Sequence, residues 1–102
     1  MEEYNVRIYP LARIDMLDIV GHLNMRPPEE AEQAYELLIG KMEMLRITPK
    51  QCPLVKDTQL RLRGYRTLVI ANYTVFLVVS GQNVDIHRIP FSRKQYDWLL
   101  HN

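Results

Sequence analysis

The sequence predicts an α+β fold: an N-terminal strand, a helical hairpin, a three-strand antiparallel meander and a short C-terminal helix. Two observations support this prediction. Apolar residues in the first half of the chain recur with helical spacing, and three runs after Gly64 are rich in Val, Ile, Leu, Tyr and Phe. Because only short connections separate these runs, we expect neighbouring strands to be antiparallel. We expect the helices to cover one face of the sheet and to leave the other face available for function.

Length and composition indicate one domain over residues 1–102. A chain of 102 residues, 47% of them apolar, buries roughly two-thirds of its unfolded surface without disulfides or metal. Cys52 is the lone cysteine and cannot form an internal disulfide, and the first residues are acidic rather than typical of a signal peptide. No apolar run approaches the roughly 20 residues of a membrane span. We therefore expect a cytoplasmic protein that has no membrane partner.

The first half predicts one strand and two helices. Residues 4–9 alternate apolar and polar side chains, as in a strand with one buried face that joins the later sheet. Pro10 suits a first helical turn, and a helix is expected over residues 11–23. A second helix is expected from Pro28 until Thr48-Pro49, with acidic residues at its start and basic residues toward its end. In the first helix we expect an apolar stripe with a three-residue spacing, formed by Leu11, Ile14, Leu17, Val20 and Leu23 and widened by Met16 and Ile19.

The second half predicts strands over residues 66–71, 73–79 and 84–89, separated by turns at Asn72, which tolerates positive φ, and at residues 80–83. Before them, residues 47–63 contain two prolines and no sustained period, so we expect a long connection in which Leu60 and Leu62 begin a strand or pack down. Connections of this length are uncommon in a compact domain unless they have a function. After the strands, a capping-box pattern predicts a short helix that carries its aromatic and apolar residues at Tyr96, Trp98, Leu99 and Leu100.

The last predicted strand changes phase. Val84 and Ile86 occupy even positions, whereas Ile89 and Phe91 occupy odd ones. This change predicts a β-bulge near His87 and Arg88, a feature that often redirects side chains next to active sites.

Charge is unevenly distributed, although the net charge is only +1. Residues 1–45 carry −5 and residues 46–102 carry +6. A basic face of this kind attracts nucleic acid or an acidic protein, and a solvated surface is the alternative interpretation. The candidate nucleic-acid-binding residues are Lys56, Arg61, Arg63, Arg88 and Lys94.

The candidate catalytic residues are Arg66, His87, Arg93 and Tyr96. Arginines bind phosphate and aromatic side chains stack on bases, and phosphodiester cleavage needs a base, an acid and cations. The alternatives are that Tyr96 packs in the core and that Arg66 and Arg88 pair with helix carboxylates. The possible carboxylate partners are Asp15, Asp18 and Glu43.

The sequence indicates no metal and no cofactor. The three histidines, His22, His87 and His101, have no metal-ligand spacing among themselves or with Cys52. No glycine-rich phosphate loop and no nucleophile elbow is present.

The runs GYRTLVIANYTVFLVV and VDIHRIPFSRKQYDWLL resemble the RelE/ParE superfamily, the toxins of bacterial type II toxin–antitoxin systems, also called plasmid stabilisation proteins. The resemblance extends over nearly the whole chain. It implies a curved sheet packed on an N-terminal helical pair and a cognate antitoxin as partner. RelE-like members cleave mRNA on the ribosome as endoribonucleases (mRNA interferases), whereas ParE-like members bind and inhibit DNA gyrase.

The resemblance also implies site residues. Arg66 matches the arginine that begins the central strand, and Arg93 matches, within one residue, the arginine just after the last strand. Tyr96 falls near the tyrosine of the terminal helix. His87 and Arg88 fall where related nucleases place further phosphate-binding or acid–base groups.

The sequence departs from the ribonuclease pattern in three respects. Its net charge is low, its lysine-rich segment is reduced to Lys50 and Lys56, and its helical hairpin is long and acidic. The hairpin is more typical of ParE-like members. Ribosome-dependent mRNA cleavage, gyrase inhibition and a non-toxic antitoxin-binding role therefore remain alternatives.

Overall fold

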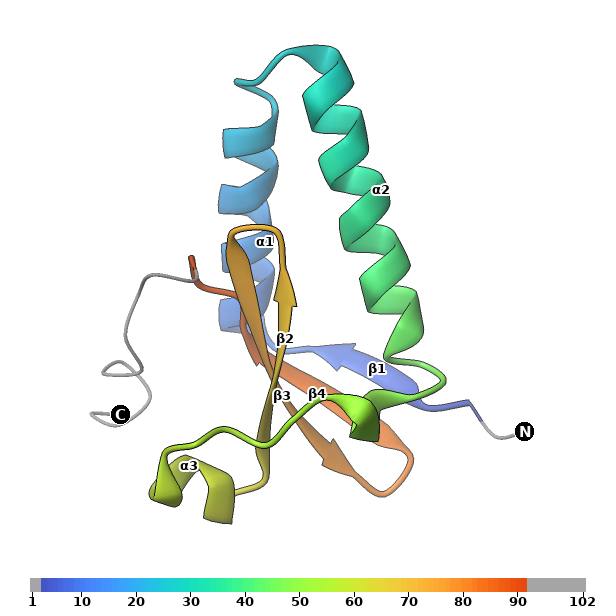
Figure 1. Cartoon of the computed structure of the whole chain (residues 1–102), viewed down its shortest axis with the longest axis vertical. Helices are drawn as coiled ribbons and strands as arrows, with labels where there is room; N and C mark the ends of the chain where they lie inside the picture. The colour runs from blue at the N-terminus through green and yellow to red at the C-terminus, as the bar shows by residue number, and fades with distance from the viewer. Residues whose placement is uncertain (1–2, 92–102) are drawn as a thin grey trace.

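A computed structural model of the chain describes residues 3–91 (Figure 1). Its elements are, in chain order, β1 (Asn5–Ile8), α1 (Pro10–Leu23), α2 (Pro28–Met44), the 3₁₀ turn η1 (Pro49–Gln51), α3 (Thr58–Leu62), β2 (Tyr65–Ile70), β3 (Tyr73–Ser80) and β4 (Asn83–Arg88). The predicted α+β order is confirmed. The predicted C-terminal helix lies outside the described residues. No described helix has the length and apolar character needed to cross a bilayer.

The four strands form one sheet in the order β1-β4-β3-β2. β2, β3 and β4 are successive antiparallel neighbours, which confirms the predicted meander. β1 lies at the edge and pairs in parallel with β4, with Asn5 opposite Asn83. At the β2–β3 turn the positive φ falls on Ala71 (52°) and not on Asn72, and at the β3–β4 turn it falls on Gly81 (60°).

The two long helices cover one face of the sheet and run side by side, with their connecting loop directed away from β1 (Figure 1). The expected stripe on α1 is wrong. A three-residue spacing rotates by about 60° per step around a helix of 3.6 residues per turn, so those five side chains cannot share a face. Of the expected set, Ile19 and Leu23 are buried in the core together with Ala12, whereas Leu17 is 71% exposed. The sheet residues packed in the same core include Ile70, Val75, Leu77, Val84 and Ile86.

Residues 47–63, predicted as a long irregular connection, contact both faces of the sheet: Cys52 is buried in the helix-side core, whereas Val55 and Leu60 partly cover the opposite face. This segment contains η1 and α3, and the carboxylate of Asp57 caps α3 by accepting the backbone N–H of Leu60 at 3.0 Å. Leu60 is buried with Val55 against Phe76, which points away from the helices because its neighbours on β3 point toward them.

The outer edge of β2 is covered by the same segment. The backbone N–H of Val55 donates to the carbonyl of Tyr65 and that of Thr67 donates to the carbonyl of Pro53, each at 3.0 Å. This pairing removes an open strand edge that would otherwise be available for aggregation.

The predicted β-bulge is confirmed. Phe76 of β3 pairs with Arg88 and Leu77 pairs with Ile86, so His87 is the extra residue of β4. Arg88 lies on the helix side, where its Nε and Nη2 donate to the carboxylate of Asp15 of α1 at 2.8 and 3.1 Å. The same carboxylate accepts the backbone N–H of Ile89 at 2.8 Å. One helix carboxylate thus holds both residues that follow the bulge.

We expect Asp15→Ala to lower the free energy of unfolding by about 2–4 kcal/mol, because it leaves a half-buried arginine and a buried backbone N–H without their acceptor. Urea denaturation followed by circular dichroism measures the change. Asp18→Ala, an exposed carboxylate one turn further along α1, is the matched control and should change the free energy by less than about 0.5 kcal/mol. Equal effects of the two substitutions would contradict the role given to Asp15.

Candidate functional site

His87 lies at the bulge, on the sheet face away from α1 and α2, between two tyrosines. The ring of Tyr9 stacks on the imidazole with ring centroids 4.5 Å apart and planes inclined by 27°. The hydroxyl of Tyr65 lies 3.1 Å from Nδ1 of His87. We call Tyr9, Tyr65 and His87 the His87 cluster. Its members come from the β1–α1 junction, the start of β2 and the bulge of β4.

Burial controls the protonation of this cluster. Loss of solvent around the half-buried imidazole lowers the pKa of His87 below its ordinary 6.5, and nearby Asp85 opposes this effect. Burial also raises the pKa of Tyr65 above its ordinary value, with Arg63 acting in the opposite direction. At pH 7 both groups are therefore neutral. A neutral imidazole whose Nδ1 bonds to a phenol can give or take a proton at Nε2, depending on its tautomer.

An ion pair adjoins the cluster on the same face. Arg7 Nε and Nη2 donate to the two carboxylate oxygens of Asp85 at 2.6 and 3.0 Å, and Asp85 is only 5% exposed. The hydrogen bond from Arg7 lowers the pKa of Asp85 despite its burial, and a hydrogen bond from Tyr9 also lowers it. The pair links β1 to β4 and keeps the carboxylate of Asp85 ionised, close enough to His87 to affect its pKa.

Arg66, the first candidate catalytic residue, is on the other side of the sheet. Successive side chains of a strand alternate between faces, so Tyr65 and Arg66 point in opposite directions. Arg66 Nη1 donates to the backbone carbonyls of Lys50 at 3.1 Å and of Cys52 at 2.7 Å. It therefore holds η1 in place, and it lies apart from His87. No described carboxylate pairs with it, so the carboxylate-pairing alternative is wrong for Arg66.

For Arg88 the same alternative is confirmed, because Asp15 binds its guanidinium. The side chain of Arg88 is 24% exposed and turned toward α1. The structure therefore does not bring Arg88 to the His87 cluster.

Three basic residues lie in or next to α3, in residues 56–63, which we call the α3 segment. Arg63 is the C-cap residue of α3 and lies close enough to Tyr65 to affect its pKa. Arg61 and Lys56 belong to the same segment, and all three side chains are exposed. None of the three forms an ion pair with a residue in the described part of the chain. Arg93, Lys94 and Tyr96 lie outside the described residues.

Sequence reasoning did not single out Tyr9, Tyr65, Arg7 or Asp85. Tyr65 and Thr67 share the strand face of Phe76, and alternation along β2 was the signal that could have separated Tyr65 from Arg66. Tyr9 and Arg7 carried no comparable signal, because their approach depends on the parallel register between β1 and β4. Within the described residues, no group of three His, Cys, Asp or Glu side chains is arranged to hold a metal ion.

No protein-family model matches the sequence, and no curated protein matches it. Solved structures do share the fold. A chain of the chromosomal ParDE TA system from P. aeruginosa superposes with a TM-score of 0.67 at 20% identity, over 86% of this chain and 95% of that one. A chain of the toxin–antitoxin complex RelBE2 from Mycobacterium tuberculosis superposes with a TM-score of 0.56 at 21% identity, over 87% of this chain and 98% of that one. These similarities confirm the predicted RelE/ParE-like fold.

We expect the imidazole of His87 to titrate at a lower pH in the folded protein than in the urea-unfolded protein, where its pKa is near its ordinary 6.5. NMR of the ring protons against pH measures both values in one sample series. Since the folded pKa is the lower one, the stability contributed by the neutral imidazole is fully present above pH 6.5 and is lost as pH falls through the folded value.

His87→Gln, which does not titrate, should therefore lose less stability than the wild type on acidification through this window. A folded pKa at or above the unfolded pKa would contradict the burial argument.

Proposed function

We propose that this protein is the toxin of a type II toxin–antitoxin system and that a cognate antitoxin holds it inactive. Two observations support the proposal: the chain resembles RelE/ParE toxins in its terminal strands, and its fold is that of chains from two toxin–antitoxin systems. A sheet with one face packed on helices and the other presenting charged and aromatic side chains suits a protein that acts by binding a large target.

We further propose that it stops growth by cleaving mRNA on the ribosome, with His87 as the acid–base group. The observation that carries this proposal is the neutral, half-buried imidazole held by Tyr65 at 3.1 Å. His87 takes the proton of a ribose 2′-hydroxyl, whose oxygen then attacks the adjacent phosphorus. The bond to the 5′-oxygen breaks, that oxygen takes the proton back from the imidazolium of His87, and a 2′,3′-cyclic phosphate remains.

Charge on the pentavalent phosphorus requires cations near His87. Arg61 and Arg63 of the α3 segment are exposed, form no ion pair with another described residue, and Arg63 lies near Tyr65; we propose that they bind the phosphate. Lys56 extends the same basic surface along the strand of RNA. We also propose that Arg93, Lys94 and Tyr96 contribute to phosphate binding, base stacking or proton transfer. Arg66 acts indirectly, by fixing the segment that leads to α3.

A second candidate is gyrase inhibition by binding, as in ParE-like proteins. The specific observation in its favour is the engagement of Arg66 by two backbone carbonyls, which removes it from phosphate chemistry. The exposed apolar side chains of α1, Leu11, Ile14 and Leu17, then offer a protein-binding surface on the helical hairpin.

The two candidates separate on induction in a bacterial host, with translation and DNA synthesis followed in parallel and with primer extension on a reporter mRNA. A ribosome-dependent nuclease stops translation and creates new 5′ ends inside translated codons. His87→Gln should reduce cleavage by roughly 100-fold or more, the loss typical of an acid–base group. Glu36→Gln, on the exposed face of α2, is the control and should leave cleavage unchanged.

Continued translation with broken DNA would instead support gyrase inhibition. In that case Leu17→Glu should abolish toxicity and His87→Gln should not. Co-expression of a cognate antitoxin should restore growth in either case, and a chain that never impairs growth would contradict the toxin proposal itself.

A further inference from the structure

Arg7 and Asp85 form an ion pair whose two partners differ in exposure. The side chain of Arg7 is 47% exposed, whereas that of Asp85 is 8% exposed. Nε and Nη2 of Arg7 both bind Asp85, so a buried carboxylate fixes the orientation of the guanidinium. A guanidinium has five N–H donors, and Nη1 of Arg7 donates to no residue between 3 and 91. The pair therefore presents a cation of fixed orientation to the solvent.

The negative charge of Asp85 is shielded from an anion that approaches Arg7. Its carboxylate accepts two hydrogen bonds from Arg7. The pKa of Asp85 is lowered chiefly by this contact, and a hydrogen bond from Tyr9 lowers it as well. The carboxylate thus lies behind its donors, and the solvent meets the guanidinium first.

Stability alone does not account for this pair. A buried carboxylate loses its hydration, and an ion pair recovers only part of that loss, so apolar residues of similar volume are often equally stable. Val78 lies opposite Asp85 on β3, so an apolar side chain at position 85 would have an apolar neighbour. The carboxylate at this position is better explained by the arginine that it orients.

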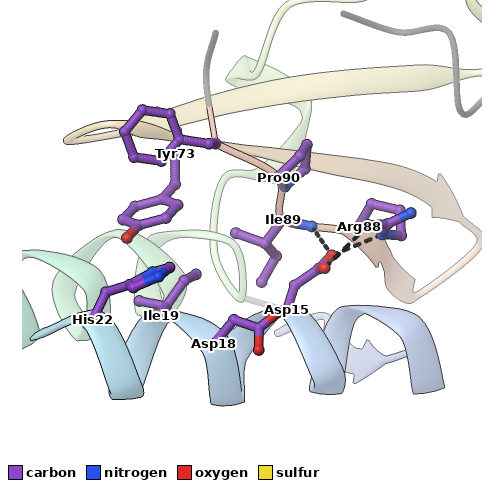
Figure 2. A pocket seen from close by; sticks show the side chains of 9 residues that line it. Asp15, Asp18, Ile19, His22, Tyr73, Arg88, Ile89 and Pro90 are labelled. Carbon is purple, nitrogen blue, oxygen red and sulfur yellow. Dashed lines mark hydrogen bonds and ion pairs between the residues drawn. The ribbon is translucent and has the colours of Figure 1, made fainter. Parts of the chain in front are cut away.

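A second pair, Arg88 with Asp15, has the same two-bond geometry but different surroundings. Figure 2 shows Arg88 and Ile89 both directed at the carboxylate of Asp15, next to α1. The side chain of Arg88 is 24% exposed. Arg88 therefore joins elements on the packed side of the sheet, whereas Arg7 lies on the side that carries His87.

Arg7 is a close neighbour of His87 on that side. Arg7 pairs with Asp85 in the register between β1 and β4, and His87 is two residues further along β4. Tyr9, two residues after Arg7, stacks on the imidazole. Two residues of a strand span about 7 Å, so one nucleotide can contact both Arg7 and His87.

We propose that Arg7 binds the scissile phosphate while His87 transfers the proton. This inference rests on the proposed ribonuclease function. Nη1 of Arg7 donates to a non-bridging oxygen, and this hydrogen bond strengthens as negative charge grows on the pentavalent phosphorus. Arg7 keeps its own proton throughout. Because Arg7 is on β1 and Arg63 precedes β2, at opposite edges of the sheet, the RNA meets a cation on each side of the imidazole.

Substitution of Arg7 alone would leave Asp85 buried without its partner, so the main variant changes both residues. Arg7→Gln with Asp85→Asn keeps the net charge and replaces the ion pair by two amides that can bond to each other. The purified full-length protein is titrated with inorganic phosphate at pH 7 and followed by NMR. In the wild type we expect phosphate to shift the Nε–H signal of Arg7 and the ring protons of His87 together.

In the double variant, the phosphate affinity reported by His87 should fall roughly tenfold or more, the scale of one charged hydrogen bond. Its imidazole stays neutral at pH 7, because Asp85 raises the pKa of His87 and its loss lowers that pKa further. Cleavage of the reporter mRNA should fall by a similar factor. Arg7→Lys keeps a cation beside Asp85 but lacks the second edge of the guanidinium, so it should also bind phosphate more weakly than the wild type.

Arg46→Gln with Glu43→Gln is the matched control. It removes an exposed arginine–carboxylate pair at the end of α2 without changing the net charge, and it should leave phosphate binding and cleavage unchanged. Circular dichroism establishes that each variant is folded. If the double variant is unfolded, Arg7→Lys decides the test.

Three results would overturn the proposal. They are full phosphate affinity at His87 in the folded Arg7 variants, a phosphate response confined to Arg61 and Arg63, and undiminished cleavage by the folded double variant. A wild type that binds phosphate at Arg7 and His87 without cleaving mRNA would uphold the anion site and overturn the ribonuclease proposal instead.

Discussion

The contact between Asp15 and the two residues after the bulge determines how the two halves of this molecule fit together. Along β4, Ile86 faces the helices, His87 faces away and Arg88 reaches Asp15 on α1; beyond the bulge Ile89 is also buried on the helix side, where strict alternation would turn it away. The carboxylate of Asp15 accepts three hydrogen bonds from Arg88 and Ile89. The residues around the bulge therefore serve both faces of the sheet. Arg88 and Ile89 bind α1 on the helix side, and His87 lies on the opposite side, between two tyrosines.

Much of the fold could be predicted from local signals. The phase change between Ile86 and Ile89 located the bulge, and the short turns established the antiparallel meander, because both features are properties of neighbouring residues. The stripe expected on α1 was wrong for Leu17 because residues spaced by three do not stay on one face of a helix that has 3.6 residues per turn. Helix α3 was missed because only five residues form it; its single local signal was Asp57, a good capping residue placed three positions before Leu60.

The site was less predictable than the fold, since its geometry depends on contacts between residues distant in sequence. His87 could be proposed from the bulge, but Tyr9 and Asp85 meet it only through the parallel pairing of the first and last strands. Arg66 illustrates the opposite problem. Its residue type suits phosphate binding, yet strand alternation turns it toward η1, where two carbonyls already occupy its guanidinium. Residue type alone cannot distinguish a cation that supports a loop from one that meets a ligand.

The parallel pairing of β1 with β4 also affects how the protein is made. β1 is synthesised first, but it cannot enter the sheet until β4, some 78 residues later, has been completed. Folding must therefore close this long loop late, which is slow compared with forming the helical hairpin. Throughout translation the growing chain has its helices but not the combination of Tyr9, Tyr65 and His87. A harmful activity located at that cluster would stay absent from every incomplete chain, and would arise only in a molecule that has finished its last strand.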